Sequence, residues 1–101
     1  MSAEAPEPNL SAIEEVQERF EELTRVLREA DRLDLAKGLQ THGTAFNSAT
    51  RVRRAVADVR QICAHWRTHP EELPDLPVVH FAVNRLEDAC REALVSGVIA
   101  A

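Results

Sequence analysis

Two histidines, His65 and His69, have the spacing that comes nearest to a metal site. They lie four positions apart in a segment with helical periodicity, so both imidazoles would face one side of a helix and could bind one ion. Two ligands do not complete a site, and histidine near the C-terminal end of a helix is also favoured by the helix dipole and by the free carbonyls there. Metal binding by His65 and His69 is therefore an alternative interpretation, and we expect no cofactor.

Charge is distributed unevenly along the 101 residues, and the middle of the chain is basic. Residues 1–40 hold ten acids and five bases, a net charge of −5; residues 41–70 hold one acid and five bases, a net charge of +4; residues 71–101 hold six acids and two bases, a net charge of −4. Arg53, Arg60 and Arg67 recur every seven residues, beside the apolar seam of the middle helix. Such positions set the pairing of helices. The arginines therefore face either acids of the same chain, which is the simpler interpretation, or an acidic partner.

A nucleic-acid-binding regulator is the second function class that this basic segment suggests. Arg51, Arg53 and Arg54 stand near the start of the expected middle helix and could contact phosphates. The net charge of the whole chain is −5 and Lys37 is its only lysine, which argues against nucleic acid as a partner.

No pattern of residues in the chain is typical of catalysis. A glycine-rich phosphate loop, a nucleophile elbow and a paired-cysteine motif are all missing from the sequence. The two cysteines, Cys63 and Cys90, occupy apolar positions of helical patterns, so we expect buried thiols. The sequence predicts a protein without enzymatic activity and assigns no catalytic residue.

Apolar spacing predicts three helices, at about residues 11–37, 47–69 and 77–96, with a short turn at 70–73. The seams of the first two alternate steps of three and four residues, which is the heptad pattern. Beyond Ala30 the first seam would need Asp34 and Lys37, which are charged, so the helix drifts, bends or ends there, and Gly38 and Gly43 mark the break. The apolar residues of the first two seams are Ile13, Val16, Phe20, Leu23, Leu27 and Ala30, and Ala49, Val52, Val56, Val59, Cys63 and Trp66.

These elements predict an all-α fold in one domain over residues 10–101, preceded by a flexible tail at residues 1–9. Short connections favour an antiparallel up-down-up bundle of three helices, or a helical hairpin with a third helix. Three helices of this size make a thin core, so we expect self-association to complete it.

The function class that follows is a small protein–protein interaction module, acting as a subunit, adaptor or regulator through coiled-coil-like packing. We expect a homodimer first and a larger protein partner otherwise, with contacts from Phe20, Leu23, Leu27 and Leu33 flanked by Arg53, Arg60 and Arg67. The chain shows neither a signal peptide nor the run of roughly 18 apolar residues that spans a bilayer. We therefore expect a cytoplasmic protein with no membrane partner.

Overall fold

The computed structural model describes residues 8–48 and 50–95, and all regular elements in these ranges are helical, which confirms the predicted all-α class. Residues 1–7 of the expected tail and the expected end of the last helix at residue 96 lie outside the described residues. Within the described ranges no helix is both long enough and apolar enough to cross a membrane. The elements in chain order are α1 (Pro8–Glu29), α2 (Leu33–Gln40), the short 3-10 helix η1 (Gly43–Asn47), α3 (Val52–Thr68), the 3-10 turn η2 (Pro70–Glu72) and α4 (Pro77–Val95).

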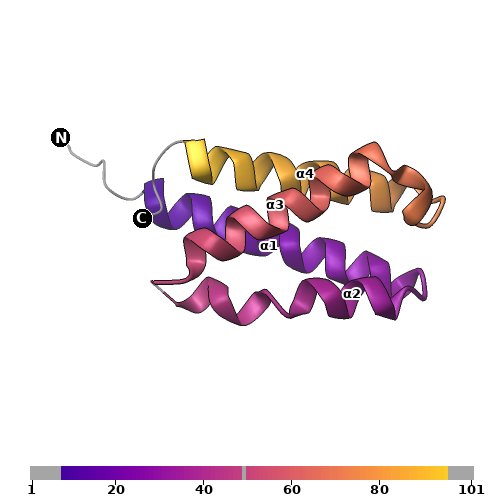
Figure 1. Ribbon diagram of the computed structural model, residues 1–101, viewed down its shortest axis with the longest axis horizontal. Coiled ribbons are helices and arrows are strands. Elements are labelled where there is room, and N and C mark those ends of the chain that lie inside the picture. The colour runs from indigo at the N-terminus through magenta and orange to yellow at the C-terminus, as the bar shows by residue number, and fades with distance from the viewer. Residues whose placement is uncertain (1–7, 49, 96–101) are drawn as a thin grey trace.

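The described helices form an elongated bundle in which each pass of the chain runs against the one before (Figure 1). The first pass is α1, and α2 followed by η1 makes the return pass. The third and fourth passes are α3 and α4. Helix α4 packs against both α1 and α3, α2 packs against α1, and η1 packs against α3. The bundle therefore has an up-down-up-down arrangement, and one of its four rods is made of two short pieces.

This arrangement differs from the predicted three-helix bundle because the first predicted helix, 11–37, is split. The chain reverses after Glu29, and residues 33–47, expected as a helix end and a connection, form the second pass. Ala36, Leu39 and Phe46 are buried from this pass, and the ring of Phe46 meets that of Phe20 edge to face at 5.0 Å between centroids. The middle helix begins at Val52 and not near 47, because residues 43–47 belong to η1.

The reversal after α1 is made by Asp31, whose φ of 63° lies in the left-handed region. The backbone N–H of Asp31 donates to the carbonyl of Arg28 at 3.0 Å, and that of Arg32 donates to the carbonyl of Leu27 at 2.9 Å. These two hydrogen bonds define a Schellman motif, which satisfies carbonyls that the helix end would leave free. Glycine usually occupies the left-handed position of this motif, so an aspartate there gives little warning in the sequence.

Replacing Asp31 by glycine is expected to stabilise the fold by about 0.5–1 kcal/mol, because glycine adopts the left-handed conformation without the steric cost of a Cβ atom. Replacing it by valine is expected to destabilise the fold by about 1–2 kcal/mol, since a β-branched residue is strongly disfavoured at positive φ. Urea unfolding of the three proteins measures both changes. Equal stability of all three would show that the turn does not have this conformation.

The core is built from the apolar faces of all four passes. Ile13 and Ala30 of the first predicted seam are only partly buried and Ala49 of the second lies outside the described residues, but Val16, Phe20, Leu23 and Leu27 of α1 are buried. So are Val52, Val56, Val59, Cys63 and Trp66 of α3. Helix α4 is buried through a broader stripe, as predicted, because it lies against two neighbours. Its buried apolar residues are Val79, Ala82, Val83, Leu86, Ala89, Cys90 and Ala93.

Candidate functional site

Three of the four apolar residues predicted for partner contact lie inside the chain's own core. Phe20, Leu23 and Leu27 are buried between α1 and the neighbouring elements, so this fold does not offer them to a partner. Leu33, at the start of α2, is 51% exposed. The heptad seam of α1 therefore holds the bundle together, and a surface for partners has to be sought elsewhere.

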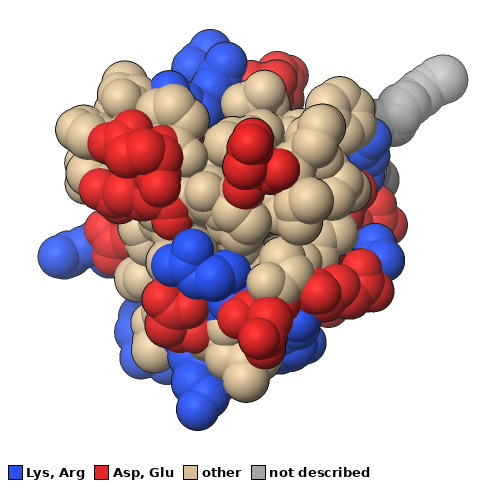
Figure 2. All heavy atoms as spheres, turned by 90° about the vertical axis from the view of Figure 1, so that its right-hand side faces the viewer, with Lys and Arg blue, Asp and Glu red and all other residues tan. Residues whose placement is uncertain are grey.

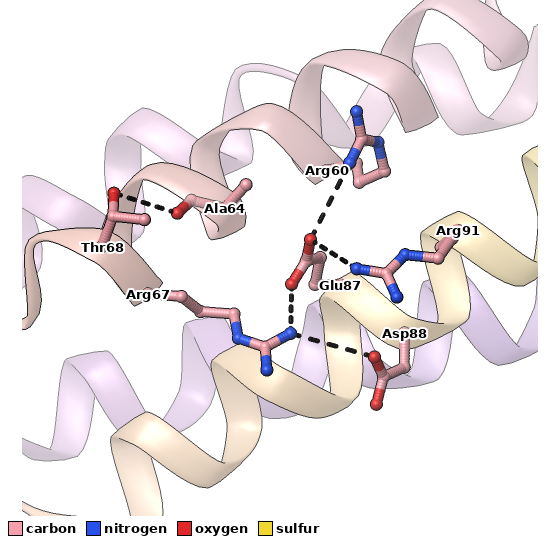
Figure 3. A network of polar contacts seen from close by, with 7 residues as sticks. All are labelled: Arg60, Ala64, Arg67, Thr68, Glu87, Asp88 and Arg91. Atoms are coloured by element: carbon pink, nitrogen blue, oxygen red, sulfur yellow. Dashed lines mark hydrogen bonds and ion pairs between the residues drawn. The ribbon is translucent and has the colours of Figure 1, made fainter.

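Two of the three flanking arginines, Arg60 and Arg67, turn to a single acid, Glu87 of α4 (Figure 3). The side chain of Glu87 is only 5% exposed, although it carries a charge. Arg67 donates through Nη1 to Glu87 Oε1, Arg91 Nη2 lies 3.2 Å from Oε2, and Arg60 Nη1 lies 3.8 Å from Oε2. The arginine ridge predicted for helix pairing is thus partly used to join α3 to α4 within one chain.

The electrostatics of this cluster keep Glu87 ionised. Burial raises the pKa of a carboxyl group, but the hydrogen bond from Arg67 and the charges of Arg67 and Arg91 outweigh it, and the pKa of Glu87 lies below its ordinary value. The same hydrogen bond raises the pKa of Arg67 further. A carboxylate held this way is a poor general acid or base near neutral pH, so the cluster is a structural ion network.

The arginines considered for nucleic acid lie around the start of α3 and are exposed. Arg54 Nε lies 3.6 Å from Asp58 Oδ2, one turn further along the same helix. Arg51 and Arg53 form no ion pair with any residue that the structure describes. The three side chains give a small exposed basic patch at one end of the bundle.

The two histidines lie side by side at the end of α3, His65 in its last turn and His69 directly after its last residue. Their rings stack with centroids 4.4 Å apart and planes 18° from parallel. His65 Nε2 lies 3.0 Å from both carboxylate oxygens of Glu72, and His69 Nδ1 lies 3.0 Å from the hydroxyl of Thr68 and 3.2 Å from the carbonyl of His65. Within residues 8–48 and 50–95 no three histidine, cysteine or acidic residues come together as a metal site would require.

Both cysteines are buried free thiols at the contact between α3 and α4, as predicted. Burial raises the pKa of Cys63, and the neighbouring Cys90 adds to this effect. Burial also raises the pKa of Cys90, to about 12. Because the thiolate is the reactive form, neither side chain is a nucleophile at neutral pH.

An open hollow of about 610 Å³ lies between α1 and the α2–η1 pass. Phe20 and Phe46 form its apolar floor, and Glu21, Thr24 and Arg28 line its α1 side. The hydroxyl of Thr24 donates to the carbonyl of Glu21 at 3.0 Å within the same helix, so it is not poised toward the hollow. The lining therefore offers a mixed polar surface and no arranged nucleophile.

A row of side chains along α4, exposed except for the half-buried Arg85, is a feature that the sequence patterns did not predict. We call it the α4 row. Its members repeat in steps of three and four, so they share one side of the helix. Three of them are large apolar side chains that stand in solvent: Val78 is 51% exposed, Phe81 56% and Val95 79%. The α4 row consists of Val78, Phe81, Arg85, Asp88, Glu92 and Val95.

The α4 row starts at the end of the molecule where α3 passes to α4. Figure 2 views the bundle from this end, and uncharged atoms cover much of its upper part, between acidic and basic side chains. Leu76, just before α4, is also exposed. Exposed apolar groups that lie together mark interaction sites more often than single exposed residues do.

Comparison of the chain with models of known protein families, with curated proteins and with solved structures finds no match.

Proposed function

We propose that this protein is a small helical interaction module that works by packing the exposed side of α4 against another polypeptide, in the first instance a second copy of itself. The observation that carries the proposal is the row of apolar side chains left in solvent on α4, with Val78, Phe81 and Val95 at heptad spacing. These contact residues replace Phe20, Leu23 and Leu27, which are buried in the chain's own core.

The α4 row suits association because its apolar side chains are exposed to water in the single chain and would be buried in a complex. Burial of apolar surface contributes about 25 cal/mol per Å², and aromatic side chains dominate the energy of many interfaces. The guanidinium of Arg85 contacts the ring of Phe81, with its central carbon 5.1 Å from the ring centroid. A contact that restricts the ring before binding lowers the entropy that binding costs.

Sedimentation equilibrium of the 101-residue chain tests the proposal. From about 10 µM to about 1 mM, the range of weak to moderate complexes, the mean mass is expected to rise from 11.3 kDa toward twice that value. Phe81→Ser is expected to weaken the association about tenfold or more. Thr50→Ala, at an exposed position just before α3, serves as the control and should not change it. A mass of 11.3 kDa at every concentration would contradict self-association.

A further inference from the structure

The charges of the α4 row are arranged so that the row is complementary to itself. Along α4 the order is two apolar residues, then Arg85, then Asp88 and Glu92, then Val95. Opposite charges thus stand on either side of the middle of the helix, three residues apart, with apolar side chains toward both ends. Set against its own reverse, the row pairs Arg85 with Asp88 at the centre and Val78 with Val95 at the ends, and between these positions Phe81 meets Glu92.

We propose that α4 pairs with α4 of a second copy, antiparallel, about a two-fold axis that crosses the helix between Leu86 and Glu87. The inference rests on the proposed function and names its partner and geometry. Antiparallel pairing about this axis places Arg85 of each copy opposite Asp88 of the other, Phe81 opposite Glu92, and Val78 opposite Val95. Each contact occurs twice, as a two-fold interface requires.

Charge decides the direction of the pairing. In a parallel pair each residue would face the same residue of the second copy. Arg85 would then meet Arg85, Asp88 would meet Asp88, and Glu92 would meet Glu92. Like charges facing each other at the centre of an interface are destabilising. The antiparallel pair replaces these repulsions by two attractive contacts between Arg85 and Asp88.

The surface beside the α4 row has room for the incoming aromatic side chain. An open hollow of about 440 Å³ lies between α1 and α4. Asp88, Ala89 and Glu92 line part of it, at the level where Phe81 of the other copy would arrive, and its other lining residues are Glu15, Arg19, Phe81 and Arg85. Arg85 Nε lies 3.6 Å from Glu22 Oε1 of α1, so α1 helps to position the guanidinium at the centre of the row.

Charge reversal tests the pairing without altering the core. Arg85→Asp places two aspartates opposite each other, and Asp88→Arg places two arginines opposite each other, so each variant alone is expected to lose at least tenfold in its association constant. In an equimolar mixture each repulsive pair becomes an attractive one, and a mixed dimer should form. The double variant Arg85→Asp, Asp88→Arg exchanges the two charges and should associate as the original protein does.

Matched reversals outside the α4 row control for net charge. Arg25→Asp and Glu14→Arg, both at exposed positions of α1, make the same changes in charge and should leave association unchanged. Circular dichroism checks that each variant is folded. If Arg85→Asp does not fold, Asp88→Arg still tests the pairing, because the side chain of Asp88 is 69% exposed. A dimeric original protein whose association is insensitive to Asp88→Arg would overturn the antiparallel geometry and leave the proposed function standing. An original protein that stays monomeric would overturn both self-association and the antiparallel pairing.

Discussion

Replacement of Leu27 by alanine is expected to lower the free energy of unfolding by about 3–4 kcal/mol, since removing buried methyl groups loses transfer energy and leaves a cavity. The side chain of Leu27 is fully buried in α1 among the elements that form the core. Urea unfolding followed by circular dichroism measures the change.

Leu33 is the matched control, because the sequence placed both leucines in one interaction surface. Leu33 is half exposed, so Leu33→Ala is expected to lower the free energy of unfolding by less than about 1 kcal/mol. If the two substitutions cost the same, α1 would not have the buried face that the fold assigns to it.

Replacement of Glu87 by alanine is expected to lower the free energy of unfolding by about 2–3 kcal/mol. Removing one member of a buried ion network leaves its partners without compensation. The loss stays below the largest values for such sites because the three arginines are partly exposed and can turn toward water. Thermal and urea unfolding of Glu87→Ala and Glu87→Gln test this, and Glu18→Gln at an exposed position of α1 should change little.

The network also predicts a dependence of stability on pH. The pKa of Glu87 is lower in the folded protein than its ordinary value of 4.5, so the carboxylate stabilises the folded state above that pH. This contribution is lost as the pH falls through the lowered pKa of the folded state. Glu87→Gln should therefore lose less stability than the original protein between pH 5 and acid pH, while Glu18→Gln should follow the original curve. If Glu87→Gln and the original protein show the same dependence of stability on pH in acid, the network does not lower the pKa of Glu87.

The helical class and most of the core followed from sequence periodicity because heptad spacing is a strong local signal. Leu23 and Leu27, and Val56 and Val59, are buried as their seams predict. The second pass was missed because the break after α1 is made by Asp31 and not by a glycine. If that turn is not recognised, the apolar residues of 33–47 are interpreted as a continuation of the first helix that is out of register with its heptad seam.

The surface was harder to predict than the core for a related reason. Periodicity finds apolar faces, but it does not say whether the same chain covers them. Phe20 was therefore predicted to contact a partner, although it is buried by other elements of its own chain. The α4 row escaped notice because charged residues occupy three of its six positions. Whether the row is available to a partner depends on which side of α4 remains exposed. The packing of α1 and α3 against the other side establishes this.

Disulfide formation between variants that each carry one added cysteine tests the antiparallel α4 pairing most directly. Val78→Cys and Val95→Cys place one exposed thiol at opposite ends of the α4 row, while the native thiols are buried and hold their protons at neutral pH. Antiparallel pairing predicts that mild oxidation of an equimolar mixture yields a disulfide-linked dimer of one copy of each variant, and that either variant alone yields far less. Efficient cross-linking of Val78→Cys with itself, or no cross-linking in the mixture, would contradict it.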